Sequence, residues 1–181
     1  MRKNRPHIGI IPMGDIPEIA PKVIAAHISG FLNLQPTLLE SMKTPFYALD
    51  TQRLQYDAGP ILQHLESGVV TPVDKIIGIL DVDLFVPVFS HVFGEARQGG
   101  RVALISIFRL KENPVSARKV SATALERAAK VALHELCHLY NLTHCESRQC
   151  LMHFSGSLLD LDQCSFNLCR YCRRFLEDAF S

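Results

Sequence analysis

The chain has 181 residues, of which 48% are hydrophobic, and its 19 basic and 18 acidic side chains leave a net charge of +1. This length suits one domain, and such a chain can bury roughly 70% of the surface that it exposes when unfolded. The balanced charge argues against a nucleic-acid or anionic-membrane partner, because both attract basic surfaces. Without a signal-peptide pattern or an apolar run of ~18 residues, we expect a cytoplasmic protein with no membrane segment.

The hydrophobic periodicity predicts strands and helices that alternate along the chain. We expect strands at 8–13, 36–42, 75–82 and 101–110, and helices at 17–32 (capped by Asp15), 60–65, 121–139 (capped by Ser121) and 163–180. This order indicates an α/β (α+β) fold, a twisted mixed sheet packed on helices. We expect a single domain over 1–181, with an upper lobe of about 1–141 and a lower lobe of about 142–181.

The helix predicted at 121–139 carries the clearest chemical pattern, His134-Glu135-Leu136-Cys137-His138. Residues four apart share one helix face, so the two imidazoles can bind one zinc ion. Glu135 is the next residue round the helix and points beside the metal. A zinc-bound water becomes more acidic, and a carboxylate at this place can act as its general base.

A third histidine, His144, follows His138 after six residues. It cannot reach the metal along a continuous helix, so the chain must turn sharply. Asn141 lies where the turn is needed, and asparagine tolerates the left-handed conformation that ends helices. Three protein ligands leave one position open for water or substrate, which is typical of catalytic zinc sites.

The segment from His134 to His144 resembles the zinc motif of the metzincin peptidases, H-E-x-x-H-x-x-G-x-x-H, with Asn141 in place of the glycine. The residues after it narrow the resemblance to the archaemetzincins, most clearly over about 74–181. By this resemblance, the chain is a zinc metallopeptidase with a long active-site helix and a small C-terminal subdomain. Met152 would be the Met-turn methionine under the metal. The resemblance also implies two zinc ions per chain, the second being a structural ion held by Cys145, Cys150, Cys169 and Cys172.

The spacing of those four cysteines also fits a closed tetrahedral thiolate site, although two free or disulfide-linked pairs remain the alternative. Cys137 and Cys164 do not match the pattern, and we expect Cys137 to pack in the core. His153 could approach the cleft, and Phe154 offers no hydroxyl group there. Asp81 and Asp83 fit the end of a strand better than a cation site.

The sequence therefore predicts a zinc metallopeptidase that acts on a peptide or protein substrate. We expect the strand at 101–110 to form the upper edge of the cleft and to pair with the extended substrate. The alternative is a zinc-binding protein without catalysis, which binds a peptide or partner. Glu135 argues against it, because a purely structural site has no use for a carboxylate beside an open coordination position. Redox sensing by Cys169 and Cys172 is a third and weaker interpretation.

Overall fold

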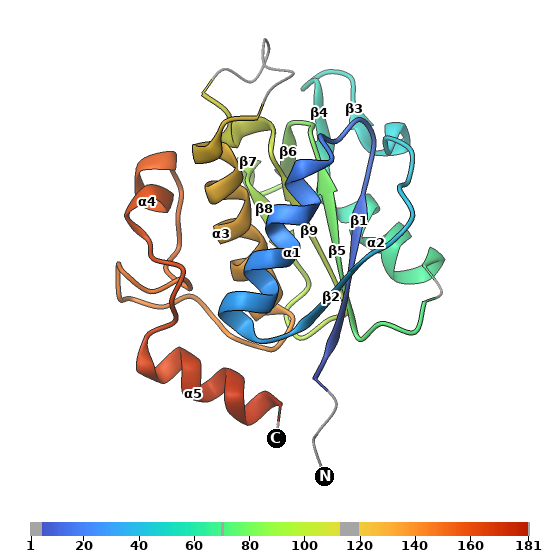
Figure 1. Cartoon of the computed structure of the whole chain (residues 1–181). Helices are drawn as coiled ribbons and strands as arrows, with labels where there is room; N and C mark the ends of the chain where they lie inside the picture. The colour runs from blue at the N-terminus through green and yellow to red at the C-terminus, as the bar shows by residue number, and fades with distance from the viewer. Residues whose placement is uncertain (1–4, 70, 113–119, 181) are drawn as a thin grey trace.

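The computed structural model describes residues 5–69, 71–112 and 120–180. In these residues the larger of two sheets has five strands (Figure 1). Their order is β2-β1-β5-β9-β8. The first four are parallel, and β8 runs antiparallel to β9. Their bounds are His7–Pro12 (β1), Gln35–Leu38 (β2), Lys75–Leu80 (β5), Gly94–Ala96 (β8) and Val102–Ser106 (β9).

Helices α1 (Ile19–Leu32) and α3 (Ala122–His138) cover one face of this sheet, and α2 (Ala58–Gly68) covers the other (Figure 1). Alternate side chains of β5 therefore enter two apolar cores. Ile77 and Ile79 belong to the core on the α1 and α3 side, while Ile76 and Leu80 belong to the core beside α2. Burial of both faces explains why this strand is an unbroken apolar run in the sequence.

The remaining elements lie around this framework. A smaller sheet has the order β3-β4-β6-β7, and two short 3-10 helices, η1 and η2, precede β3 and follow β9. Helices α4 and α5 lie beside the framework after α3 (Figure 1). The bounds are Phe46–Ala48 (η1), Leu49–Asp50 (β3), Gln55–Asp57 (β4), Leu84–Val86 (β6), Phe89–Val92 (β7), Phe108–Leu110 (η2), Leu158–Gln163 (α4) and Arg170–Ala179 (α5).

The mixed fold predicted from the sequence is confirmed, but several element predictions need correction. The helix expected at 163–180 begins later, at Arg170, as α5. A separate helix that was not expected, α4, precedes it, because a capping box between Ser157 and Asp160 starts α4 and Cys164 ends it. Asp15 does not cap α1, whose N-cap residue is Glu18 without a side-chain hydrogen bond. The strand expected at 36–42 is shorter, and only an isolated bridge joins Met42 to Met13.

The prediction that 101–110 forms the edge of the cleft is wrong. In the large sheet β9 lies between β5 and β8, and all five of its residues are buried. The strand ends at Ser106, after which Phe108–Leu110 forms η2. In the described residues the two terminal strands of this sheet are β2 and β8, and β8 is the one that lines the cleft. A run of apolar residues without alternation is typical of a central strand, because neighbours cover it on every side.

Asp81 and Asp83 follow β5 and both meet basic side chains. Asp83 accepts two hydrogen bonds from Arg109, at 2.5 and 2.7 Å, and Asp81 lies 2.8 Å from the ammonium group of Lys111. These pairs support the structural interpretation of the two acids over a cation site. None of the helices in the described residues is long and apolar enough to cross a bilayer.

Candidate active site

Helix α3 carries three of the predicted site residues. The Ser121 side chain accepts a hydrogen bond from the Ala124 N–H and caps the helix, as predicted. The buried face of the helix packs against α1, β8 and β9. This packing holds the last two turns of α3 along the sheet, so the site residues of these turns line the cleft beside β8.

The chain leaves α3 through the turn that the sequence predicted. Asn141 has a φ of 67°, in the left-handed region. Its N–H donates to the His138 carbonyl at 3.0 Å, and the Leu142 N–H donates to the Cys137 carbonyl at 3.2 Å. This pair of hydrogen bonds is the usual means of ending a helix with a left-handed residue. The turn directs the chain back toward the helix, which brings His144 to the other two histidines.

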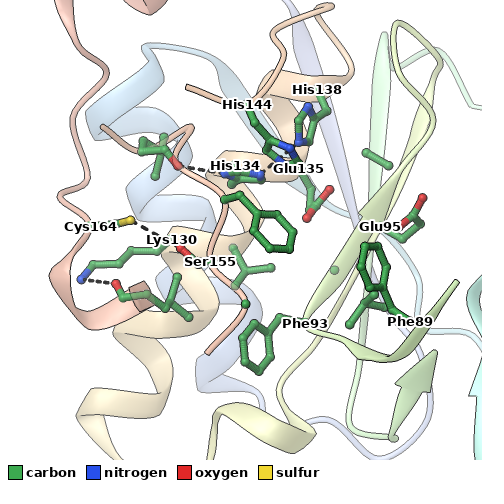
Figure 2. A pocket seen from close by; sticks show the side chains of 18 of the residues that line it. Phe89, Phe93, Glu95, Lys130, His134, Glu135, His138, His144, Ser155 and Cys164 are labelled. Atoms are coloured by element: carbon green, nitrogen blue, oxygen red, sulfur yellow. Dashed lines mark hydrogen bonds between the residues drawn. The ribbon is translucent and has the colours of Figure 1, made fainter. Parts of the chain in front are cut away.

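The three imidazoles converge on one point (Figure 2). One nitrogen of each of His134, His138 and His144 lies within 4.8 Å of the others. The Nε2 atoms of His134 and His138 are 3.0 Å apart. The sequence spacing thus predicted a cluster that the fold brings together.

Hydrogen bonds at the far side of two rings fix their protonation. The Nδ1 atom of His134 lies 2.8 Å from the Leu151 carbonyl, and the Nδ1 atom of His138 lies 2.6 Å from the Leu142 carbonyl. A carbonyl oxygen can only accept, so each Nδ1 carries the proton and each Nε2 keeps its lone pair. Two lone pairs that face each other at 3.0 Å repel unless a cation lies between the rings. The donor set therefore fits a zinc ion.

The electrostatic surroundings also keep these rings neutral. Burial and the neighbouring His138 lower the pKa of His134 to about 3. Burial likewise lowers the pKa of His138 and of His144. Neutral imidazole is the form that binds metals, so the three side chains are in the ligating state at physiological pH.

Glu135 lies beside the histidine cluster and not within it (Figure 2). Its side chain packs against β8 at Gly94, where an added Cβ would lie 2.7 Å from the Glu135 Cγ and 2.8 Å from its Oε1. Burial and the neighbouring charge of Glu95 raise the pKa of Glu135 well above its usual range. The sequence pattern predicted the carboxylate, but it did not reveal the contribution of Gly94 and Glu95.

The histidines and Glu135 line a cleft with a volume of about 570 Å³. Strands β7 and β8 form one wall of the cleft, and residues after Met152 contribute to the other. Phe89 and Phe154, one from each wall, approach to 6.3 Å between ring centroids. The Phe154 ring also packs edge-on against His144, with centroids 5.2 Å apart. The cleft is therefore narrow and largely apolar next to the three histidines.

A second group of possible metal ligands follows His144. The Sγ atoms of Cys145, Cys150, Cys169 and Cys172 all lie within 4.8 Å of one another. All six cysteines lie in the described residues and are free thiols, so the disulfide alternative does not hold in this structure. Hydrogen bonding from the Cys172 N–H lowers the pKa of Cys169 to about 7, whereas burial raises the pKa of Cys150 and of Cys172. Cys169 is therefore the thiol of these three that most readily gives the thiolate that metals bind.

Met152 is fully buried, in a turn that the His153 N–H closes by donating to the Cys150 carbonyl at 2.9 Å. The imidazole of His153 hydrogen-bonds to the Cys145 carbonyl and does not line the cleft. Cys137 is buried in the core, as expected. Cys164 is also buried and contributes to the cleft wall, which no pattern in the sequence indicated.

Comparison with known proteins agrees with this geometry. The family model described as peptidase family M54 matches residues 22–178. The chain belongs to this family. It is 36% identical to an archaemetzincin of Methanopyrus kandleri over 83% of this chain and 82% of that protein. It is 32% identical to an archaemetzincin of Methanocaldococcus jannaschii over 94% of this chain and 93% of that protein.

Solved structures of this family have the same fold. The crystal structure of the Methanopyrus kandleri archaemetzincin matches with a TM-score of 0.85 and 33% identity, covering 99% of this chain and 97% of that chain. The archaemetzincin of Archaeoglobus fulgidus matches with a TM-score of 0.80 and 29% identity, covering 93% of this chain and 99% of that chain. The family resemblance is therefore confirmed, and the chain is a zinc metallopeptidase.

Proposed function

We propose that this member of peptidase family M54 hydrolyses peptide bonds with Glu135 as general base and with zinc held by His134, His138 and His144. The observation that carries the proposal is that the Nε2 atoms of His134 and His138 face each other at 3.0 Å, with Glu135 beside them (Figure 2). A structural zinc site is normally closed by four protein ligands, whereas three ligands leave a position for chemistry.

Zinc, when bound, would polarise the scissile carbonyl and lower the pKa of the attacking water. Glu135 takes a proton from this water while the water oxygen forms a bond to the carbonyl carbon. The same carboxyl group then gives the proton to the leaving amine as the C–N bond breaks. Burial and the neighbouring charge of Glu95 raise the pKa of Glu135, so its carboxylate is a stronger base toward the proton of the water.

The substrate would lie along β8, the terminal strand of the large sheet that lines the cleft. An extended peptide can add to such a strand through main-chain hydrogen bonds. Gly94 leaves room for Glu135 directly behind this strand. The peptide would then pass between the β8 wall and Phe154, with its scissile bond next to the three histidines. The net charge of +1 offers no large basic surface for nucleic acid.

We further propose that Cys145, Cys150, Cys169 and Cys172 hold a second, structural zinc ion. Four thiolates form a closed tetrahedral set without an open position, which is typical of structural sites. Met152 would serve as the buried apolar floor between this site and the histidines. Because four free thiols stay reduced in the cytoplasm, we also propose a cytoplasmic location.

The test is metal content and peptide cleavage for the wild type and for Glu135→Ala, with Glu40→Ala, an exposed acid far from the cleft, as matched control. We expect close to two zinc ions per chain in all three proteins. Cleavage of a random peptide mixture should occur with the wild type and Glu40→Ala only. Two zinc ions without cleavage by any of them would favour the non-catalytic alternative, and one zinc ion would mean that one site is misassigned.

A further inference from the structure

The turn between β8 and β9, residues 97–100, reaches from the large sheet to the end of α3. The Gly100 N–H donates to the Arg97 carbonyl at 2.7 Å and closes the turn. Gly99 has a φ of +65°, and an added Cβ there would lie 2.3 Å from the Asn141 Oδ1. Glycine is needed for both reasons. The turn therefore fits closely against the left-handed residue that ends α3.

Main-chain hydrogen bonds connect this turn to a predicted zinc ligand. The Gly99 N–H donates to the His138 carbonyl at 2.9 Å, and the Asn141 N–H donates to the same oxygen at 3.0 Å. Carbonyls in the last turn of a helix have no partner within the helix. Here the turn between β8 and β9 supplies one of the two donors, so the 97–100 turn helps to hold the end of α3 in place.

A side-chain hydrogen bond extends the same connection. The Gln98 Nε2 donates to the Leu142 carbonyl at 3.1 Å, and the His138 Nδ1 donates to this oxygen at 2.6 Å. A carbonyl oxygen has two lone pairs, so both are used. Gln98 fixes the position of the carbonyl that orients the His138 ring. Leu142 precedes His144 by two residues, so the same hydrogen bond also restrains the segment with the third histidine.

We propose that Gln98 and Gly99 are positioning residues for the zinc site, Gln98 acting through the Leu142 carbonyl and Gly99 through the His138 carbonyl. Gln98 also lines the cleft beside β8, the strand proposed to pair with the substrate. The 97–100 turn thus links the substrate-binding edge of the sheet to His138 and His144. This inference rests on the proposed histidine zinc site, but it does not depend on peptide hydrolysis.

The test replaces Gln98 by Met, which keeps the length of the side chain and removes the donor. The matched control is Gln63→Met at an exposed position of α2. Zinc affinity of the whole chain is measured by competition with a chelator, and the visible absorption of the cobalt-substituted protein reports the ligand geometry. We expect Gln98→Met to weaken one of the two zinc affinities about tenfold and to change the cobalt spectrum. Gln63→Met should do neither.

Combining Gln98→Met with a second substitution shows whether the change in zinc affinity arises at the histidine site. In His138→Ala, which lacks a ligand of this site, adding Gln98→Met should leave the remaining zinc affinity unchanged. The proposal is overturned if Gln98→Met changes zinc affinity less than twofold in the wild type. It is equally overturned if the loss persists in His138→Ala. Peptide cleavage by the wild type is measured separately and tests only the proposed hydrolysis. If the wild type does not cleave peptides, the zinc affinities still decide whether Gln98 positions the zinc site.

Discussion

Every residue of β9 is buried, whereas α5 buries only Leu176 among its ten residues. The same contrast separates the large sheet from residues 142–180, the described part of the predicted lower lobe. The sheet has apolar side chains on both faces. The buried residues of 142–180 are few, and two are cysteines: Leu142, Cys150, Leu151, Met152, Leu161, Cys164 and Leu176. The sheet can be stabilised by burial of apolar side chains, but the C-terminal part needs additional stabilising interactions.

The structure indicates two such interactions. One is the cluster of four thiols, which we propose to be a zinc site. The other joins α3 to α4, where Arg127 pairs with Asp162 and the Lys130 ammonium group donates to the Leu161 carbonyl at 3.3 Å. Since His134 and His138 come from α3 and His144 from the C-terminal part, the candidate active site lies where the two regions meet. Its geometry therefore depends on both forms of stabilisation.

The largest expected effect comes from removing one thiol, by Cys169→Ala. Structural zinc contributes about 10–16 kcal/mol to the folding of small zinc domains, so the region around α5 should unfold locally. Helix capping is not at issue, because the Cys169 side chain makes no cap hydrogen bond. Hydrogen exchange should show loss of amide protection in α5, while β5 and β9 remain protected.

The matched control is Cys164→Ala, which removes a buried thiol from the same region but outside the group of four. This variant should retain two zinc ions and the protection of α5. If α5 stays protected in Cys169→Ala, or if both variants lose protection equally, then the thiols do not stabilise this region through a metal. The contrast between the two regions would then need another explanation.

A smaller effect is expected at Gly94, where the sheet positions Glu135. In Gly94→Ala the new Cβ would lie 2.7 Å from the Glu135 Cγ and 2.9 Å from the Leu104 carbonyl oxygen. Overpacking of this kind costs about 1–3 kcal/mol of stability. Displacement of a catalytic group by about 1 Å can lower the rate by about 10²-fold. Peptide cleavage should therefore fall strongly, while zinc content stays at the wild-type value.

Gly30→Ala is the control for this substitution, because no atom lies within 4 Å of the added Cβ. Gly30 lies inside α1, where alanine is favoured over glycine by about 0.5–1 kcal/mol. This variant should be slightly more stable and equally active. Wild-type activity in Gly94→Ala would show that Glu135 does not depend on its contact with β8.

The sequence predicted those parts of the site that depend on local geometry. His134 and His138 share a helix face by spacing alone, and Asn141 indicated the turn that returns His144. Candidate metal ligands of this kind can be found because a short segment of chain carries both the histidines and the turn. Their hydrogen-bond partners could not be found in this way. Gln98 and Gly94 reach α3 only because β8 pairs with β9 in the folded sheet.

The errors in the fold prediction have a related cause. The sequence did indicate the central position of β9, because its first four residues are all apolar and only the last, Ser106, is polar. Such a run shows no alternation of polar and apolar side chains. The edge strand β8 has only three residues, Gly94–Ala96, which is too short for any period to be detected. The capping box at Ser157 and Asp160 is a local signal for the start of α4 and could have separated it from α5.

The smallest expected effect concerns the ion pair between α3 and α4. Arg127 donates two hydrogen bonds to Asp162, at 2.7 and 2.6 Å, and this bonding lowers the pKa of the Asp162 carboxyl group. Because the folded pKa lies below the unfolded value of about 3.9, the pair stabilises the protein above that pH. The contribution disappears as the pH falls through the folded pKa. Since the Asp162 side chain is 41% exposed, the effect should not exceed about 1 kcal/mol.

Urea denaturation of Asp162→Asn and the wild type between pH 6 and pH 3 measures this contribution. We expect the variant to be less stable at pH 6 and the difference to shrink toward pH 3, because protonation removes the charge from the wild-type carboxylate. Asp178→Asn is the control, since its pair with Arg174 lies on the exposed face of α5, with side-chain exposures of 60% and 76%. If Asp162→Asn lowers the free energy of unfolding by the same amount at every pH, then the charge of Asp162 does not stabilise the contact between α4 and α3. Packing alone would then attach α4 to α3.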